Sequence, residues 1–338
     1  MTARDNPHPI GIGLDDGYAF TKVALPDGRL VAVPSRGRIG HSNITWLNAS
    51  QQRVFEYETD DTVFAVGDVD GEPTQFDGYP FSGLNRAIVQ HALQEAGLAG
   101  HSMHAVSGLP VSSFYFEDGA QRTELISRKR ASLKQPARPF DGRLPAGIAF
   151  HEVIPEALAA WYDHVISETE DGVLLESERL TVPVAVVDIG GRTTDFVVVA
   201  DQAVWHASSG SLRCGLLDLR RQVTAAICVR FDLDALSERT VEEALRSGQV
   251  RLFGNTHDVS VIVREARREI VARLHAETER HLGRGAELER ILFVGGGTLA
   301  LANDIRNWFP NQMIAEHPAF ANARGMLKYL RHVCSEPD

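Results

Sequence analysis

The stretch that most constrains the fold is Val184–Val199, with the sequence VAVVDIGGRTTDFVVV. Two apolar runs of strand-like composition are separated here by six residues, Asp188-Ile189-Gly190-Gly191-Arg192-Thr193, so the pattern predicts two strands joined by a tight glycine-rich turn. Glycine lets backbone N–H groups approach an anion closely, and Thr193 adds a hydroxyl donor. The carboxylates of Asp188 and Asp195 stand at the ends of the turn, where they could hold a hydrated Mg²⁺ ion. Phosphate and a metal ion are therefore the first ligands to expect.

The composition indicates a globular protein of two lobes rather than one small core. The chain has 338 residues, of which 43% are hydrophobic and 23% charged. Its net charge of −11 argues against a large nucleic-acid surface and leaves room only for a local basic patch, so contact with DNA would run through a partner. The three cysteines are far apart, which predicts neither a disulfide framework nor a zinc site and favours a reducing, cytoplasmic location. No run approaches the roughly 18 apolar residues of a membrane span, and no export signal is predicted.

A weaker copy of the central hairpin lies near the start of the chain. Ile10–Leu14 predicts a strand that runs into Asp15-Asp16-Gly17, and Phe20–Leu25 resumes as a second strand. The ammonium group of Lys22, on the returning strand, could reach a phosphate held in the turn. The alternative is an ordinary hairpin with an exposed lysine.

A third glycine element follows the apolar strand predicted at Arg290–Val294. Gly295-Gly296-Gly297-Thr298 stands where that strand meets a helix expected over Leu299–Phe309. Three successive glycines let a flat ring or a phosphate approach the backbone closely. The loop that ends at Gly215, before another predicted helix, is a weaker signal for a phosphate or ribose at a helix N-terminus.

Glu156 has two readings. Pro155-Glu156 is expected to open a helix that runs toward Ile166, because proline suits the first helical turn and glutamate suits its positive end. Helix capping would then explain Glu156 without any function. Alternatively, Glu156 orients a water molecule for attack on a phosphate.

A basic cluster also has two readings. It consists of Arg128, Lys129, Arg130, Lys134 and Arg138. It is either a docking face for an acidic partner or a neighbouring subunit, or a solvated helix and loop surface.

Read together, the three glycine elements resemble the two phosphate motifs and the adenosine motif of the actin, sugar-kinase and Hsp70 superfamily. Their order along the chain is D-D-G, then D-x-G-G-x-T-x-D, then strand-G-G-G-helix. The chain is most similar to the bacterial actin-like plasmid segregation ATPases of the ParM/StbA family. Further similar stretches are Ala87–Leu93, Gly108-Leu109-Pro110 and Arg324-Gly325-Met326, so the likeness runs from about residue 10 to about residue 330.

The resemblance implies an α/β, two-lobed actin-like ATPase fold, in which ribonuclease H-like lobes hold a nucleotide cleft between them. Each lobe is expected to contain a mixed five-stranded sheet flanked by helices. Lobe I is expected over residues 8–168, with a small inserted subdomain around 35–80, and lobe II over 178–310. Residues 311–338 are expected to form a C-terminal helix that packs back on a lobe.

The resemblance also implies a set of site residues. Asp188 and Glu156 are the expected catalytic pair, with Glu156 in the place of the family's water-activating glutamate. Asp15 and Asp188 are expected to hold Mg²⁺, through water. The residues expected to bind ATP or ADP are Asp15, Asp16, Gly17, Tyr18, Lys22, Gly190, Gly191, Arg192, Thr193, Asp195, Gly215, Gly295, Gly296, Gly297 and Thr298. Two of them depart from the family pattern: Tyr18 is bulky for the first turn, and Arg192 fills a variable place that either faces the γ-phosphate or points outward.

For function, the resemblance implies ATP hydrolysis coupled to head-to-tail filament assembly in the cytoplasm. The expected partners are further copies of the chain and a DNA-binding adaptor protein, with plasmid DNA contacted only indirectly and no membrane involved. Two other readings stay open. One is a regulator that binds nucleotide without polymerising, and the other is a small-molecule kinase of the same superfamily.

Overall fold

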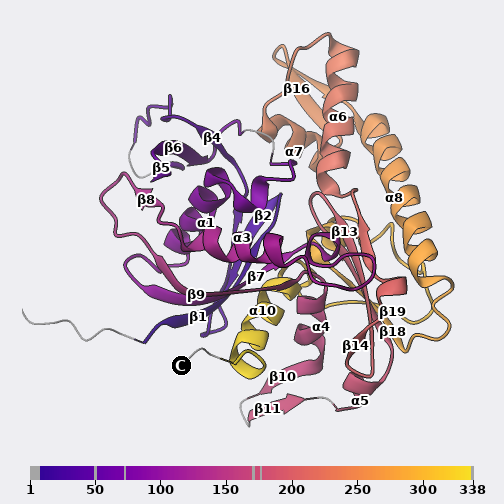
Figure 1. The fold of residues 1–338 in the computed structure, drawn as a ribbon. Coiled ribbons are helices and arrows are strands. Elements are labelled where there is room, and N and C mark those ends of the chain that lie inside the picture. The colour runs from indigo at the N-terminus through magenta and orange to yellow at the C-terminus, as the bar shows by residue number, and fades with distance from the viewer. Residues whose placement is uncertain (1–7, 49–51, 72–73, 170–171, 176, 336–338) are drawn as a thin grey trace, which may run out of the picture.

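The computed structural model describes residues 8–48, 52–71, 74–169, 172–175 and 177–335. Two α/β lobes lie side by side, the N-terminal one in indigo and purple and the C-terminal one mainly in orange (Figure 1). Within the described part of the chain, every helix is too short or too polar to cross a membrane.

Lobe I is built on a five-stranded sheet in the order β3-β2-β1-β7-β9. Its strands are β1 (Ile10–Asp16), β2 (Phe20–Ala24), β3 (Leu30–Pro34), β7 (Ser102–Leu109) and β9 (Gly147–Pro155). The first three strands form an antiparallel meander, and β7 and β9 add on in parallel to β1. The helices α1 (Gly83–Glu95), α2 (Val111–Phe114) and α3 (Thr123–Lys134) belong to the same lobe. The hairpin predicted from the first D-D-G element is therefore confirmed.

A small four-stranded sheet is inserted into lobe I, in the order β4-β6-β5-β8. Its strands are β4 (Gly37–Ile39), β5 (Val54–Thr59), β6 (Thr62–Gly67) and β8 (Arg138–Pro139). The last of these comes from a later part of the chain, beyond the 35–80 segment.

Lobe II repeats the arrangement of lobe I. Its sheet has the order β14-β13-β12-β18-β19, with β15 paired to β13. The strands are β12 (Val184–Ile189), β13 (Thr194–Ala200), β14 (Ala203–Val204), β15 (Gly210–Leu212), β18 (Arg290–Val294) and β19 (Gln312–Ile314). As in lobe I, an antiparallel hairpin, β12–β13, is followed by a parallel neighbour, β18. Residues 312–314 thus complete the sheet of lobe II rather than the C-terminal helix.

Helices and one hairpin cover the lobe II sheet and extend beyond it. They are α6 (Leu216–Phe231), α7 (Glu238–Ser247), α8 (Ser260–Leu282), α9 (Gly295–Ala300) and the hairpin of β16 (Gln249–Leu252) and β17 (Asn255–Asp258). The α7 helix and the β16–β17 hairpin lie at one end of the molecule (Figure 1).

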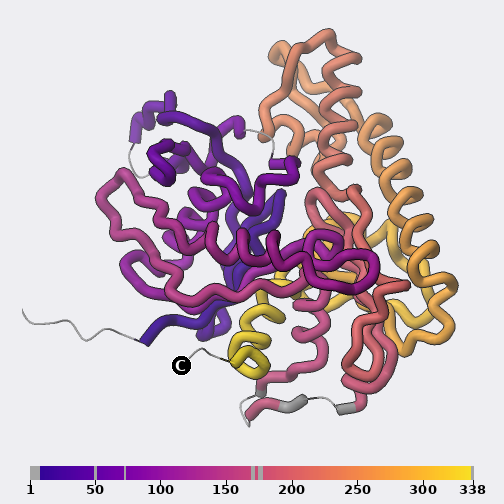
Figure 2. Tube along the Cα trace, in the orientation of Figure 1, coloured from indigo at the N-terminus to yellow at the C-terminus, as the bar shows by residue number. Residues whose placement is uncertain are grey.

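Two helices cross between the lobes. The helix α4 (Leu158–Val165) leaves lobe I and packs through Trp161 and Val165 against the lobe II sheet. The C-terminal helix α10 (Ala321–His332) leaves lobe II and packs through Met326 and Leu330 against the lobe I sheet. The trace in Figure 2 shows α10, in yellow, beside the strands of lobe I. At Gly325 a Cβ atom would collide with the carbonyl of Ala159 in α4, so glycine is required where the two helices touch.

Several element boundaries differ from the sequence-based expectations. Pro155 ends β9 instead of opening a helix. Ala157 has a φ of 58°, which is not a helical conformation, so α4 begins only after it. The helix α9 begins at Gly295 itself and ends at Ala300, whereas the expected helix covered Leu299–Phe309. The connector between the lobes contains a hairpin of β10 (Ile166–Thr169) and β11 (Gly172–Leu175), followed by α5 (Ser177–Thr181).

Candidate functional site

The two glycine turns face each other across the lobes. A Cβ atom at Gly191 would lie 2.7 Å from the Cβ of Ala19 and 3.0 Å from its backbone nitrogen, so the β12–β13 turn contacts the β1–β2 turn. The start of α6 is bound to the same place, because Leu217 N donates to the Gly191 carbonyl at 2.8 Å. At Gly215 a Cβ would collide with that carbonyl. The hairpin turns of both lobes and the N-terminus of α6 therefore meet at one point.

Four acidic side chains converge beside these turns. Asp15 is the penultimate residue of β1, Asp188 lies near the end of β12, Asp195 lies opposite it on β13, and Glu156 follows β9. Burial and the nearby Asp195 and Asp15 raise the pKa of Asp188 to about 7. Burial, together with Asp195, Asp15 and Asp188, also raises the pKa of Glu156 well above its usual range. The ionised forms of these four side chains repel one another, and a bound cation would reduce that repulsion.

The carboxylates of Asp15, Asp188 and Asp195 are each held by a different part of the chain. Lys22 Nζ lies 2.7 Å from Asp15 Oδ2. Although burial opposes its charged form, Asp15 raises the pKa of Lys22 overall.

Asp188 and Asp195 are held from outside their own hairpin. Asn322 Nδ2 donates to Asp188 Oδ2 at 2.6 Å, and the backbone nitrogen of Val111 donates to Asp195 Oδ1 at 2.9 Å. The Ser211 hydroxyl also donates to Asp195. Asn322 and Ser211 were not singled out from the sequence; the nearest signal was the Arg324-Gly325-Met326 stretch, two residues after Asn322.

Glu156 is held against the end of β7. Its backbone nitrogen donates to the Leu109 carbonyl at 2.8 Å, and a Cβ at Gly108 would lie 2.6 Å from the Glu156 Cγ. The glycine of the Gly108-Leu109-Pro110 stretch therefore leaves the space that the Glu156 side chain occupies.

Asp16 is engaged elsewhere, in a buried ion pair. Its carboxylate accepts from the Lys129 ammonium and, at 2.9 Å, from Asn85 Nδ2. Lys129 also donates to the Pro80 carbonyl at 3.1 Å and is 0% exposed. Burial raises the pKa of Asp16, and Lys129 opposes that shift. In this structure the Asp16 carboxylate thus ties β1 to α3.

The basic cluster does not form one surface. Lys129 is buried on Asp16, Arg130 is paired with Glu152, and the guanidinium of Arg128 lies 4.6 Å from the centre of the Phe81 ring. A single docking face made of all five basic residues is therefore ruled out.

The side chain of Arg192, in the β12–β13 turn of lobe II, reaches across to lobe I. Its guanidinium lies 2.5 Å from Asp77 Oδ1 and 5.1 Å from the centre of the Tyr18 ring. The Tyr18 carbonyl accepts from the Thr74 hydroxyl at 2.6 Å, and burial raises the pKa of Tyr18. Arg192 and Tyr18 thus form part of a bridge between the lobes.

A second bridge lies nearer the outer end of the lobes. Arg36, after β3, is paired with Glu238 and Glu242 of α7, and Arg220 of α6 is paired with the same two glutamates. Between the bridges is a cavity of about 540 Å³ whose walls include Tyr18 and Thr74 from lobe I and Leu217 from lobe II. This volume falls in the range of small-molecule sites, about 300–1,000 Å³.

The third glycine element packs directly on the second. Gly295 has a φ of 91°, and a Cβ there would collide with Asp188 Oδ1. A Cβ at Gly297 would collide with Ile189, whereas Gly296 faces open space. Thr298 is buried and its hydroxyl donates to the Val294 carbonyl at 2.5 Å. Gly296 is therefore the member of the triplet at which a flat ring could approach the backbone.

The remaining predicted residues lie in the two turns. The Gly17 carbonyl accepts from the Ser35 hydroxyl at 2.7 Å, and Gly190 N donates to the Thr193 carbonyl at 2.9 Å. The Thr193 side chain also hydrogen-bonds to Asp195. The structure therefore gathers all of the predicted residues around the junction of the lobes, with the side chains of Asp16, Arg192 and Thr298 engaged in other contacts.

The donor set suits a hydrated divalent cation. Among the described residues, no three His, Cys, Asp or Glu side chains are arranged to bind a metal directly. Mg²⁺ keeps several of its waters and is usually held by one or two carboxylates together with substrate phosphates. Asp15 and Asp188 fit that role, and the buried Asn322 Oδ1, which has no hydrogen-bond donor within the described residues, fits an acceptor for a metal-bound water.

Comparison with known proteins identifies related folds. Residues 11–166 match the family model "Plasmid segregation protein ParM, N-terminal", and residues 186–307 match "Archaeal actin homologue MreB-like, C-terminal". No curated protein matches the chain by sequence.

Solved structures match over nearly the whole chain. The archaeal actin homologue Ta0583, in complex with ADP, is 21% identical with a TM-score of 0.73, over 95% of this chain and 99% of that one. A 15-stranded ParM filament from Clostridium botulinum is 19% identical with a TM-score of 0.73, over 96% and 99% of the two chains. At these identities the likeness establishes the fold, which is the expected two-lobed actin-like ATPase fold.

Proposed function

We propose that this chain, which belongs to the actin-like proteins with an N-terminal lobe of the ParM/StbA type, is an ATP hydrolase that forms filaments with ATP and Mg²⁺ and moves plasmid DNA through an adaptor protein. The observation that carries the proposal is the meeting of the two glycine turns beside Asp15, Asp188 and Glu156. Two proteins of this fold support it: Ta0583 was solved in complex with ADP, and the ParM of Clostridium botulinum was solved as a filament.

Phosphoryl transfer depends mainly on positioning and on neutralising charge. The backbone N–H groups of the two turns would bind the phosphates, and Lys22 would supply a positive charge beside Asp15. Mg²⁺, when bound, would neutralise phosphate charge, with Asp15 and Asp188 holding its waters. Glu156 would orient the attacking water and accept its proton once a bound cation offsets the repulsion from Asp195, Asp15 and Asp188 that helps to raise its pKa.

Nucleotide in the cleft would act on the angle between the lobes. The turns come from different lobes, so a ligand that binds both favours their closed arrangement. The bridges Arg192–Asp77 and Arg36–Glu242 also join the lobes, and any opening must break them.

Exposed apolar side chains at opposite ends of the molecule support head-to-tail assembly. Phe253, between β16 and β17, is 75% exposed, and Val173, in β11, is 51% exposed. The two hairpins lie at opposite ends (Figure 1). A contact between different surfaces of identical subunits does not close on itself and therefore propagates as a filament.

The test combines ATP turnover with sedimentation and light scattering, each with and without ATP and Mg²⁺. We expect the parent protein to hydrolyse ATP and to sediment only with nucleotide. Asp188→Ala should hydrolyse ATP much more slowly and need more Mg²⁺ for nucleotide binding, whereas Phe253→Ser should bind nucleotide normally and assemble poorly. A parent protein that neither binds nucleotide nor assembles would refute the proposal. Turnover strongly stimulated by a sugar or an organic acid, without scattering, would instead support a small-molecule kinase.

The adaptor is tested separately. Because the net charge is −11, we expect filaments of the protein alone not to retain plasmid DNA when they are sedimented. Retention of plasmid DNA without a second protein would contradict the adaptor.

A further inference from the structure

Asn322 connects the C-terminal helix to Asp188. It is the second residue of α10, it is 7% exposed, and its Nδ2 lies 2.6 Å from Asp188 Oδ2. A carboxylate can only accept hydrogen bonds, so the amide nitrogen must be the atom that faces it. Asp188 is therefore oriented by a residue 134 positions away in the sequence.

The other side-chain atom of Asn322 is an unused acceptor. Its Oδ1 is buried and has no hydrogen-bond donor in the described part of the chain. An unsatisfied buried acceptor typically costs about 1–3 kcal/mol. Its presence next to Asp188 therefore points to a donor that arrives with a ligand.

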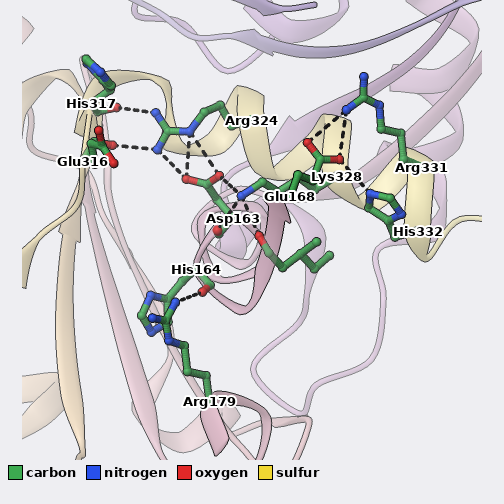
Figure 3. Close-up of polar contacts among 11 residues, drawn as sticks. Asp163, His164, Glu168, Arg179, Glu316, His317, Arg324, Lys328, Arg331 and His332 are labelled. Atoms are coloured by element: carbon green, nitrogen blue, oxygen red, sulfur yellow. Dashed lines mark hydrogen bonds and ion pairs between the residues drawn. The ribbon is translucent and has the colours of Figure 1, made fainter. Parts of the chain in front are cut away.

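The position of α10 is fixed along its length by contacts with α4 and β10 (Figure 3). Arg324 binds both carboxylate oxygens of Asp163 in α4, at 2.5 Å and 3.2 Å, and Lys328 lies 2.8 Å from the same carboxylate. Arg331 and His332 bind Glu168 in β10 at 3.0 Å and 2.8 Å. The helix that carries Asn322 is thus held to the same segment that begins just after Glu156.

We infer that Asn322 is a positioning residue for a nucleotide-bound divalent cation. Its Nδ2 fixes the direction of the Asp188 carboxylate, and its Oδ1 accepts a hydrogen bond from a water molecule of the hydrated cation. The inference rests on the proposed function, because it names a residue that acts on the metal through Asp188.

The experiment measures ADP binding by calorimetry over a range of Mg²⁺ concentrations. The variants are Asn322→Leu, which keeps the volume, and Asn322→Ala, which does not; both lack the donor and the acceptor. We expect both to need about 10–100-fold more Mg²⁺ for half-maximal strengthening of ADP binding, as is usual when a partner of a metal ligand is lost. ADP binding without Mg²⁺ should be unchanged.

The matched control is Arg324→Gln, which weakens the contact of α10 with Asp163 but leaves Asn322 in place. It should lower thermal stability without changing the Mg²⁺ requirement. In an Asp188→Ala background, Asn322→Leu should have no further effect on Mg²⁺ dependence, because the group that it orients is gone.

The outcomes separate this inference from the proposed function. If the parent protein shows Mg²⁺-dependent ADP binding and Asn322→Leu matches it, the inference is wrong and the proposed function stands. If only Asn322→Ala is impaired, Asn322 acts through packing, and the inference is again wrong. If the parent protein does not bind ADP, both fail. Thermal unfolding of each variant establishes that it is folded. If Asn322→Ala does not fold, the comparison of Asn322→Leu with the parent protein still tests the inference.

Discussion

The buried ion pair between Lys129 and Asp16 offers a demanding test of the structure. Lys129 is 0% exposed and donates to Asp16 across 113 positions of sequence. Replacing Lys129 with methionine keeps most of the side-chain volume but leaves the Asp16 carboxylate with Asn85 as its remaining side-chain donor. Removing one partner of a buried pair typically costs about 3–5 kcal/mol, since it leaves an uncompensated buried charge. We expect Lys129→Met to lower the free energy of unfolding by that amount near neutral pH.

The same structure predicts that a second change repairs the first. In the double variant Asp16→Asn and Lys129→Met, no buried charge is left. Replacing a whole buried pair by neutral groups of similar size is often neutral or stabilising. We therefore expect the double variant to recover to within about 1 kcal/mol of the parent protein.

The pH dependence follows from the direction of the Asp16 shift. Burial raises the pKa of Asp16, and Lys129 opposes this, so without Lys129 the folded-state pKa lies further above the unfolded value. The unfolded chain then holds fewer protons than the folded one, and stability falls as pH rises through that interval. The deficit of Lys129→Met should therefore be largest at high pH and shrink as pH falls toward the unfolded value.

The assay is urea unfolding followed by circular dichroism at several pH values, with ADP binding measured in parallel. If Lys129→Met stays within about 1 kcal/mol of the parent at pH 8, the pair is not buried as described. If the double variant is no better than the single one, the loss comes from packing and not from charge. Normal ADP binding by a folded double variant would show that the Asp16 carboxylate is not needed for nucleotide.

Three further predictions follow from other parts of the structure. Gly295→Ala should lower stability by about 1–3 kcal/mol, because a side chain there adopts a left-handed backbone conformation and displaces Asp188, whereas Gly296→Ala should unfold like the parent. Arg36→Ala should speed ADP release by about fivefold, since loss of a partly exposed ion-pair bridge costs about 1 kcal/mol, and the difference should shrink at high salt. His151 is buried and burial lowers its pKa to about 3 from 6.5, so its contribution to stability is complete above pH 6.5 and is lost as pH falls toward 3. His151→Gln should therefore reduce the loss of unfolding free energy between pH 7 and pH 5 by about 2 kcal/mol.

Each of these has a contrary result. Equal unfolding curves for the two glycine variants would show that position 295 accepts a side chain without strain and without displacing Asp188. Release of ADP from Arg36→Ala at the parent rate, at low salt, would mean that the α7 glutamates do not hold the lobes together. An unchanged acid profile in the His151 variant would place the pH dependence elsewhere.

Much of the fold and part of the site could be predicted from the sequence, because their signals are local. An apolar run, a glycine-rich turn and a second apolar run specify a hairpin within 16 residues, and β12 and β13 form as expected. The same kind of local pattern predicted β1, β2 and the glycine triplet after β18. That these elements gather at one cleft was implied by the resemblance to the ParM/StbA family, because no local signal connects them.

Partners far apart in sequence were decided by the tertiary structure alone. Nothing local separates a buried lysine such as Lys129 from its exposed neighbours on α3, nor tells that Arg192 faces Asp77 of the other lobe. The start of α4 was misplaced because the positive φ of Ala157 leaves no composition signal.

The glycines and acids of the central hairpin thus predicted a site for phosphate and a metal ion, since backbone freedom and charge are properties of residue type. How that site is held was decided by the packing of the lobes. The helix α10 brings Asn322 to Asp188, and the end of β9 brings Glu156 to the same junction, from positions that no sequence spacing connects.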